Sequence, residues 1–121
     1  MSVLDASALL AFLHGEAGAD AAEAALVAGA RCSAANWSEA AQQVLARGGN
    51  WDLARALLLS YGLTVEPVTA DDAESAARLW RRGAGLSLGD RLCLALAQRL
   101  DLVALTTDRA WGAGPGVRQL R

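Results

Sequence analysis

The chain has 121 residues, of which 54% are hydrophobic and 20% are charged, and its formal net charge at pH 7 is -2. This length and composition predict a single domain over residues 1–121 whose core needs neither disulfides nor structural metal. No apolar stretch is long enough to cross a bilayer, and the opening reaches Asp5 before a signal-like segment forms, so we expect a cytoplasmic protein without membrane contact.

In the first half of the chain, short apolar runs alternate with segments whose apolar residues recur at helical spacing. Glycines and an asparagine punctuate these segments, and a helix that Asn36 or Ser38 caps ends at Gly48-Gly49-Asn50. The predicted elements are, in order, a strand at 3–4, helices at 8–13 and 19–27, a strand at 31–33, the capped helix around Glu39, and a helix at 51–60.

The second half continues the alternation and adds a glycine-rich loop before Asp90. The predicted elements are a strand at 64–68, a helix at 71–82, a largely buried helix from Asp90 to Leu100, a strand at 102–105, a short turn at 109–111 and a last strand near Val117. Strands that alternate with helices predict an α/β fold: a parallel sheet of about four to five short strands, with helices on both faces in three α/β/α layers.

Four carboxylates stand where these elements meet. Asp5 and Asp108 follow predicted strands, whereas Glu39 and Asp90 lie in the first turns of predicted helices. In open parallel sheets, ligand sites form beyond the carboxyl ends of the strands, so all four side chains can face one crevice. Anionic groups held together repel unless they are protonated or neutralised, and oxygen ligands suit a hard divalent cation, so the implied cofactor is Mg²⁺ or Mn²⁺.

Each acid also has a local interpretation. Aspartate is a favoured helix cap, and Asp5, Asp90 and Asp108 all precede helical patterns. Glu39 alone is typical of a solvated helix residue or of a capping arrangement. The prediction of a site therefore depends on the ordered set of four and not on any single residue.

Four segments carry a resemblance to a known family: VLDASALLAF, SAANWSEAAQ, LSLGDRLCLALA and LTTDRAW. In this order and spacing they resemble the four motif blocks of PIN-domain proteins, and the likeness is closest to the VapC-type toxins of bacterial toxin–antitoxin pairs. It extends from Val3 to Trp111, which is nearly the whole chain. The resemblance implies a single PIN-like domain.

The resemblance also implies a role for each matching residue. Asp5, Glu39 and Asp90 form the acidic core that binds metal, and Asp108 is a fourth, more peripheral acid. Ser7 and Thr106 match the hydroxyl positions beside the first and last aspartates, and Asn36 matches a polar residue ahead of the glutamate. All three are candidate supports of the site, and for Ser7 and Thr106 the alternative is that they simply bond nearby backbone groups.

The activity that the resemblance implies is that of a Mg²⁺-dependent endoribonuclease, with Mn²⁺ as a possible substitute, that acts as the toxin of a type II toxin–antitoxin pair. Its partners are then an RNA substrate, a second copy of the chain, and a cognate antitoxin that lays a helix along a hydrophobic groove on the helices between residues 19 and 60. Arg91 and Arg109 each follow an aspartate and are candidate phosphate contacts, with surface ion pairing as the alternative. All 11 basic residues are arginine, the side chain best suited to bidentate phosphate contact, although the net charge gives no sign of a cationic surface.

Two other classes compete with this interpretation. A haloacid-dehalogenase-like, metal-dependent phosphohydrolase also begins with a strand and an aspartate, but it needs a second aspartate where Ser7 stands and a lysine at the phosphate, and the chain has no lysine. A non-catalytic protein-binding module with a structural acidic cluster is the other alternative. A mechanism that uses paired histidines is excluded because His14 is the only histidine.

Overall fold

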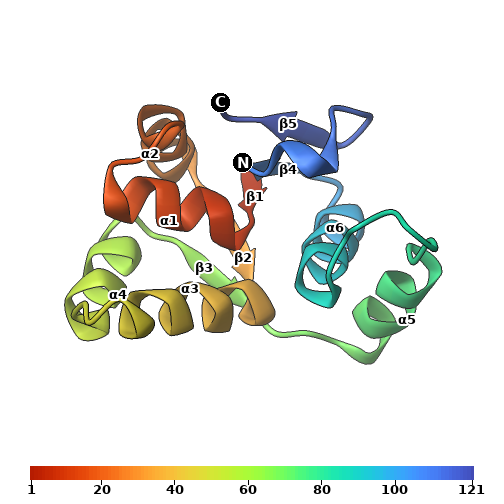
Figure 1. Cartoon of the computed structure of the whole chain (residues 1–121), viewed down its shortest axis with the longest axis horizontal. Coiled ribbons are helices and arrows are strands. Elements are labelled where there is room, and N and C mark those ends of the chain that lie inside the picture. Colours follow the sequence, from red (N-terminus) through yellow and green to blue (C-terminus); the bar gives the residue numbers. More distant parts are fainter.

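A computed structural model describes residues 1–121 and contains one fully parallel sheet in the order β3-β2-β1-β4-β5 (Figure 1). The strands are β1 (Ser2–Leu4), β2 (Ala30–Ser33), β3 (Thr64–Glu66), β4 (Val103–Thr106) and β5 (Val117–Gln119). From central β1 the chain builds outward to β2 and β3, and it then returns to the other side of β1 to add β4 and β5. This reversal places a topological switch point between the carboxyl ends of β1 and β4, the usual place for a ligand crevice in open α/β sheets.

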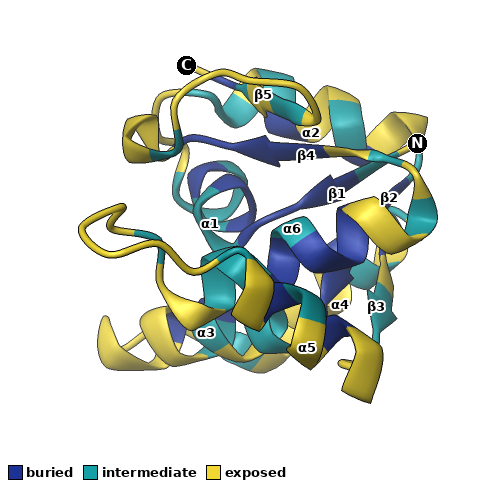
Figure 2. Ribbon diagram, turned by 90° about the vertical axis from the view of Figure 1, so that its right-hand side faces the viewer, coloured by how far each residue is buried: buried dark blue, intermediate teal, exposed yellow.

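Six helices cover the two faces of the sheet, and the predicted three-layer α/β/α arrangement is confirmed. They are α1 (Ala6–His14), α2 (Ala19–Ala28), α3 (Ala34–Ala46), α4 (Trp51–Ser60), α5 (Ala70–Arg78) and α6 (Leu88–Leu100), and a single 3₁₀ turn, η1 (Arg109–Trp111), follows β4. Helices α1 and α2 pack on one face, and α6 packs on the other with α5 outside it (Figures 1 and 2). No helix combines the length and apolar character needed to span a membrane.

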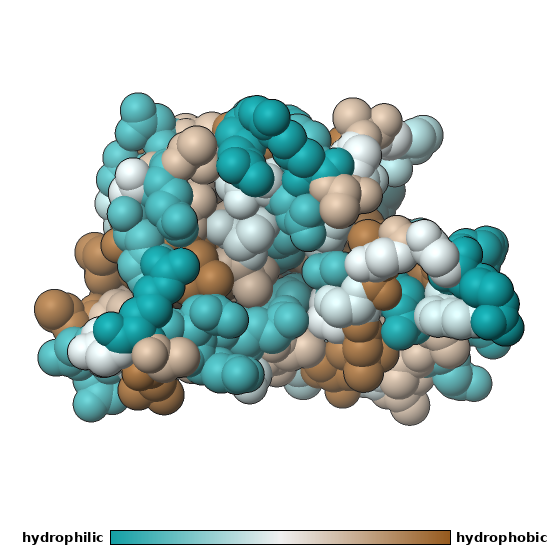
Figure 3. Space-filling model, in the orientation of Figure 1, coloured by the Kyte–Doolittle hydropathy of each residue, from teal (hydrophilic) through white to brown (hydrophobic).

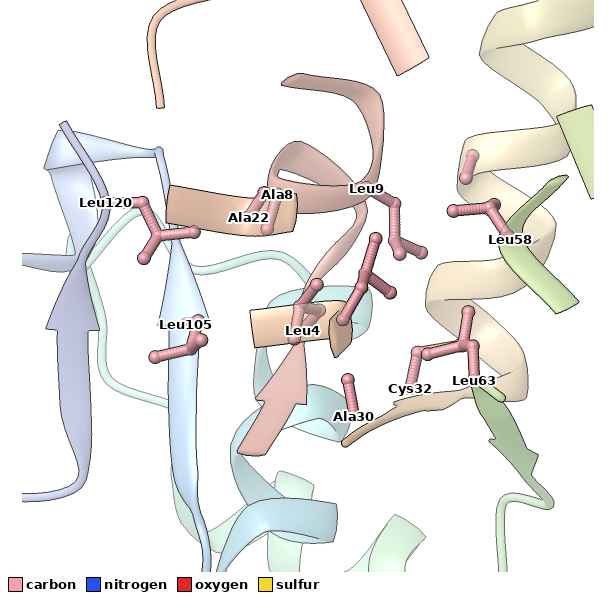
Figure 4. Packing of buried hydrophobic residues seen from close by; sticks show 12 residues of the cluster. Leu4, Ala8, Leu9, Ala22, Ala30, Cys32, Leu58, Leu63, Leu105 and Leu120 are labelled. Carbon is pink, nitrogen blue, oxygen red and sulfur yellow. The ribbon is translucent and has the colours of Figure 1, made fainter. Parts of the chain in front are cut away.

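The two central strands have both faces buried, as Figure 2 shows. Successive side chains of a strand point to opposite faces. Leu4 and Leu105 therefore pack on the side of α1 and α2 (Figure 4), whereas Val3 and Ala104 pack on the other side. Their partners there are three residues of α6, namely Cys93, Leu96 and Ala97. This burial on both faces holds the ends of β1 and β4 rigidly beneath the switch point.

Several helix boundaries differ from the sequence expectation, and capping accounts for the starts of α3 and α6. Helix α3 begins at Ala34 because the Ser33 hydroxyl accepts from the backbone N–H of Ala35 at 3.1 Å, so the expected cap at Asn36 or Ser38 was wrong. Helix α6 begins two residues before Asp90, because Ser87 caps it. Helix α5 ends at Arg78 and not at residue 82, and the following loop turns through Gly83 and Gly85, both at positive φ.

Candidate active site

Asp5 occupies the switch point, directly after β1 and at the start of α1. Its side chain is buried, with 3% of the residue exposed. Oδ1 accepts the backbone N–H of Ala8 at 2.8 Å and the hydroxyl of Ser7 at 2.6 Å, and Oδ2 accepts the hydroxyl of Thr106 at 2.6 Å. Asp5 is thus a helix cap, as the local interpretation predicts, but its carboxylate also receives two side-chain hydroxyls.

Ser7 and Thr106 are held in turn by the chain beyond β4. The Ser7 hydroxyl oxygen accepts the backbone N–H of Thr107 at 2.9 Å, and that of Thr106 accepts the N–H of Asp108 at 3.0 Å. Both sequence interpretations of these residues therefore apply, because each hydroxyl bonds backbone and also donates to Asp5. The network fixes the orientation of the Asp5 carboxylate and joins the carboxyl ends of β1 and β4.

The environment of Asp5 disfavours its negative charge. Burial raises the pKa of Asp5 from 3.8 to about 6, and the nearby charge of Asp90 adds to this rise. The hydrogen bonds from Ser7, Thr106 and Ala8 oppose it only in part. A buried aspartate whose ionised form is disfavoured in this way marks a candidate functional position.

Glu39 extends from α3 across to the first turn of α6. Asn36, which is 1% exposed, donates from Nδ2 to Glu39 Oε1 at 2.7 Å and to the backbone oxygen of Gly89 at 3.2 Å. The asparagine therefore ties the first turns of α3 and α6 together and aims the Glu39 carboxylate at Gly89. Its position inside α3, one turn before Glu39, explains why it serves the glutamate and not the helix cap.

Asp90 is fixed by a capping box at the start of α6. Its Oδ2 accepts the backbone N–H of Ser87 at 2.9 Å, and its own N–H donates to the Ser87 hydroxyl at 3.1 Å. The Cys93 thiol lies one turn further along α6, and burial raises its pKa. The nearby charges of Asp5, Asp90 and Glu39 raise that pKa further. Three of the four expected acids therefore surround one region, where the N-termini of α1, α3 and α6 meet (Figure 1).

The fourth acid and the two arginines lie differently. Asp108 is exposed at the rim and caps η1 by accepting the N–H of Ala110 at 2.9 Å. Arg109 is exposed and makes no side-chain hydrogen bond or ion pair. Arg91 is half-buried and donates from Nη1 to the backbone oxygen of Ala76 at 2.9 Å, which ties α6 to α5. Arg109 is consequently the better placed of the two for contact with an incoming phosphate.

The donor set suits a hard divalent cation. None of the four acids has a cationic side-chain partner, because the ion pairs of the protein involve other acids, namely Glu16, Glu66 and Asp72. The Asn36 Oδ1 is buried without a hydrogen-bond donor, which adds an unused oxygen beside Glu39. No three His, Cys, Asp or Glu side chains converge closely enough to enclose an ion. Mg²⁺ keeps several of its waters and binds through one or two carboxylates, so the residues fit it without such a cage.

Sequence reasoning missed two neighbours of the acids. Ser87 holds Asp90, and the Ser-x-x-Asp spacing of a capping box is a signal that could have found it. Gly89 accepts the Asn36 amide on its backbone oxygen and lies against the Glu39 carboxylate. Nothing in the sequence alone distinguishes Gly89 from the loop glycines before it.

The family model of the PIN domain matches residues 2–113, which include all the acids described above. With the parallel sheet and the acids at its switch point, this match shows that the chain belongs to the PIN-domain family.

Within that family the chain is a VapC-type protein. It is 38% identical over 108 residues to a VapC ribonuclease of Mycobacterium bovis and to ribonuclease VapC42 of Mycobacterium tuberculosis, with 79% of this chain and 82% of each relative covered. Two solved structures share its fold. A toxin–antitoxin complex from Klebsiella pneumoniae superposes with a TM-score of 0.77 at 24% identity over 100% of this chain and 98% of that one. The toxin VapC20 of M. tuberculosis, which cleaves the sarcin–ricin loop, has a TM-score of 0.70 at 23% identity over 88% of both chains.

Proposed function

We propose that this protein is a Mg²⁺-dependent endoribonuclease and the toxin of a type II toxin–antitoxin pair. The observation that carries the proposal is Asp5, a buried carboxylate without a cationic partner that two hydroxyls orient at the switch point, beside Asp90 and Glu39. The relatives named as ribonucleases support the same reaction class. Its substrate is RNA, and its place of work is the cytoplasm.

In this proposal each acid is held ready by the chain itself. Ser7 and Thr106 keep their protons toward the two oxygens of Asp5, so its carboxylate stays in one orientation and acts as a ligand. Asn36 does the same for Glu39, and the Ser87 backbone fixes one oxygen of Asp90 while the other stays available. Rigid support of this kind keeps the ligands in place before substrate arrives.

A divalent cation at these acids supplies activation of a water for attack on the phosphorus and neutralises charge on the phosphoryl oxygens. Asp108 at the rim completes the acidic set on the side where β4 ends. Arg109, next to it and free of other contacts, binds the RNA phosphate and offsets the repulsion between the acids and the nucleic-acid backbone. Hydrolysis by an activated water needs no covalent intermediate with the chain, so the proposed reaction is a direct attack of water on the phosphorus.

The proposed antitoxin contact lies on α3 and α4, within residues 19–60, and extends to the end of α1. An apolar groove runs between the end of α1, the end of α3 and α4, and its lining includes Leu13, Val44, Leu53 and Leu57. Leu53 is 68% exposed and Leu57 is 44% exposed, and Figure 3 shows apolar surface gathered at the edge where α4 lies. An amphipathic helix of the antitoxin fits such a groove. The toxin–antitoxin complex with the same fold supports a partner of this kind, and a homodimer is part of the same proposal.

The test is cleavage of an RNA pool, containing structured and single-stranded members, by partner-free protein with Mg²⁺, with Mn²⁺ and with EDTA. Asp5→Asn and Asp90→Asn remove one acid each, and Asp20→Asn, at an exposed aspartate in the first turn of α2, is the matched control. We expect cleavage that needs the metal and both site aspartates and that Asp20→Asn leaves unchanged. Sequencing of the products then defines the target.

A folded protein that binds Mn²⁺ but cleaves no RNA in the pool would contradict the proposal and favour the non-catalytic binding module. Cleavage that persists in EDTA or in Asp5→Asn would contradict the metal-dependent mechanism. Hydrolysis of small phosphate esters without RNA cleavage would instead indicate the phosphohydrolase alternative. The same protein preparations distinguish all three outcomes.

A further inference from the structure

The backbone conformation at Gly89 does not require a glycine. It is the second residue of α6, and it is absent from the residues whose φ is positive. In a helix, glycine is less favourable than alanine because it loses more conformational freedom on folding. A residue that local structure disfavours calls for another explanation.

The side chain of Glu39 supplies that explanation. A Cβ atom on Gly89 would lie 2.6 Å from both Oε1 and Oε2 of Glu39 and 2.7 Å from its Cδ, which is closer than atoms of this kind approach in proteins. No other atom lies among the three nearest to that position. All three of the nearest atoms belong to Glu39, so its carboxylate takes up the space that a methyl group on Gly89 would need.

We propose that Gly89 is a positioning residue, whose lack of a side chain lets the Glu39 carboxylate lie against the first turn of α6, next to Asp90. This inference rests on the proposed function, because it gives a reason for bringing the two acids together. Asn36 completes the arrangement by donating both to Glu39 Oε1 and to the Gly89 oxygen. Gly89 and Asn36 together set the distance between an acid of α3 and an acid of α6.

The geometry separates this role from a role in stability. The group that a methyl would displace is the end of a flexible side chain at a half-buried residue, so the backbone of α6 need not move. Gly89→Ala should then leave the fold intact and favour the helix, while it moves Glu39 away from Asp90 and removes an acceptor from Asn36. A purely structural glycine would show the reverse, with stability lost and the acids unaffected.

The experiment measures Mn²⁺ binding and unfolding for Gly89→Ala beside Gly114→Ala. Gly114 is a matched control because its φ is not positive and no atom lies within 4 Å of the position of its Cβ. Isothermal titration with Mn²⁺ alone is expected to show roughly 10–100-fold weaker binding in Gly89→Ala, the range typical when a residue that orients metal ligands is lost. In EDTA, the unfolding midpoint of Gly89→Ala should equal or exceed that of the wild type.

Two further readouts test the mechanism. In a Glu39→Ala background, adding Gly89→Ala should have no further effect on Mn²⁺ binding, because the displaced group is already absent. In the metal-free protein, the Asn36 side-chain amide resonance should shift in Gly89→Ala and stay in place in Gly114→Ala. Wild-type Mn²⁺ affinity in Gly89→Ala, or an equal loss in both backgrounds, would overturn the inference.

The remaining outcomes of the experiment also test the inference. If Gly89→Ala fails to fold and Glu39→Ala does not restore folding, the glycine is structural and the inference is wrong. If the wild type binds Mn²⁺ but cleaves no RNA, the proposed function fails while the Gly89 comparison still stands or falls by itself. If the wild type binds no Mn²⁺, the positioning role at a cation site is overturned together with the proposed cofactor.

Discussion

Replacement of Asp5 by asparagine should make the metal-free protein more stable while it abolishes metal binding. Asparagine is close in shape to a protonated aspartate, it remains a good helix cap, and it can keep the bonds to Ala8 and Ser7 on its oxygen. What it removes is the ionised carboxylate, which burial destabilises. The substitution therefore separates the energetic cost of the site from its function.

The size of the effect follows from the pKa. Burial raises the pKa of Asp5 from 3.8 to about 6, which corresponds to about 3 kcal/mol against the ionised form in the folded protein. A carboxyl whose pKa is raised on folding contributes its stability below pH 3.8 and loses it as the pH rises through about 6. We expect Asp5→Asn to be about 1–3 kcal/mol more stable than the wild type at about pH 8, the lower end allowing for the reversed bond to Thr106, with a gap that narrows toward acid pH.

The assay is urea unfolding in EDTA from about pH 8 down to about pH 5, followed by the same series with Mn²⁺ in place of EDTA. Asp108→Asn is the control, since an exposed aspartate should change the free energy of unfolding by no more than about 0.5 kcal/mol. Mn²⁺ should stabilise the wild type and leave Asp5→Asn unchanged, by linkage. A variant no more stable than the wild type at about pH 8, or a gap that does not depend on pH, would refute the reasoning.

Three other expectations address the rest of the molecule. Asp72→Asn should lower the free energy of unfolding by about 2 kcal/mol at neutral pH, because the buried Asp72 receives two hydrogen bonds from Arg99. These bonds lower the pKa of Asp72, so its contribution is present above the ordinary carboxyl range and is lost as the pH falls, opposite in sign to Asp5, and pH-dependent thermal unfolding would detect the difference. Cys32 and Cys93 are fully buried, and burial raises the pKa of Cys32 to about 12. Neither thiol should therefore react with a disulfide reagent at about pH 8 unless urea is added. Rapid labelling of the folded protein would contradict this burial. Leu53→Glu should weaken binding of the antitoxin at least about tenfold in titration calorimetry while unfolding in urea stays unchanged, and unaltered binding would place the groove elsewhere.

The elements of the fold could be predicted wherever one signal dominated. The helix at 51–60 was predicted with its observed bounds, because Asn50 caps it and the apolar residues keep helical spacing. The start of α6 was harder to predict, because its capping box puts the N-cap, Ser87, three residues before Asp90, the acid that stands out in the sequence. The order of the strands could not be predicted at all from local pattern, since it depends on long-range pairing such as that of Val3 with Ala104.

The site divides in the same way. Asp5 could be placed because it follows the first strand, whose carboxyl end lies at the edge of a parallel sheet where ligand sites form. Asp90 could be placed because it lies in the first turn of a recognisable helix. The contact between Glu39 and Gly89 could not be found, because their separation along the chain carries no periodic signal and depends on how α3 packs against α6. The hydrogen bond from Arg91 to the backbone oxygen of Ala76 in α5 could not be predicted either, because the neighbouring Asp90 suggests that Arg91 faces the acids.

The arrangement of the helices reduces the cost of gathering the acids. Asp5 caps α1, Asp90 lies in the first turn of α6, and Glu39 reaches that same first turn, so each carboxylate lies at a helix N-terminus, where backbone N–H groups favour negative charge. For Asp5 this compensation is incomplete, as its raised pKa shows. If the helix N-termini stabilised the ionised carboxylates fully, the acids would gain less free energy from binding a cation. Under the proposed function, a divalent cation bound at Asp5 would relieve this residual cost, and the affinity for the cation would then be linked to the stability of the fold.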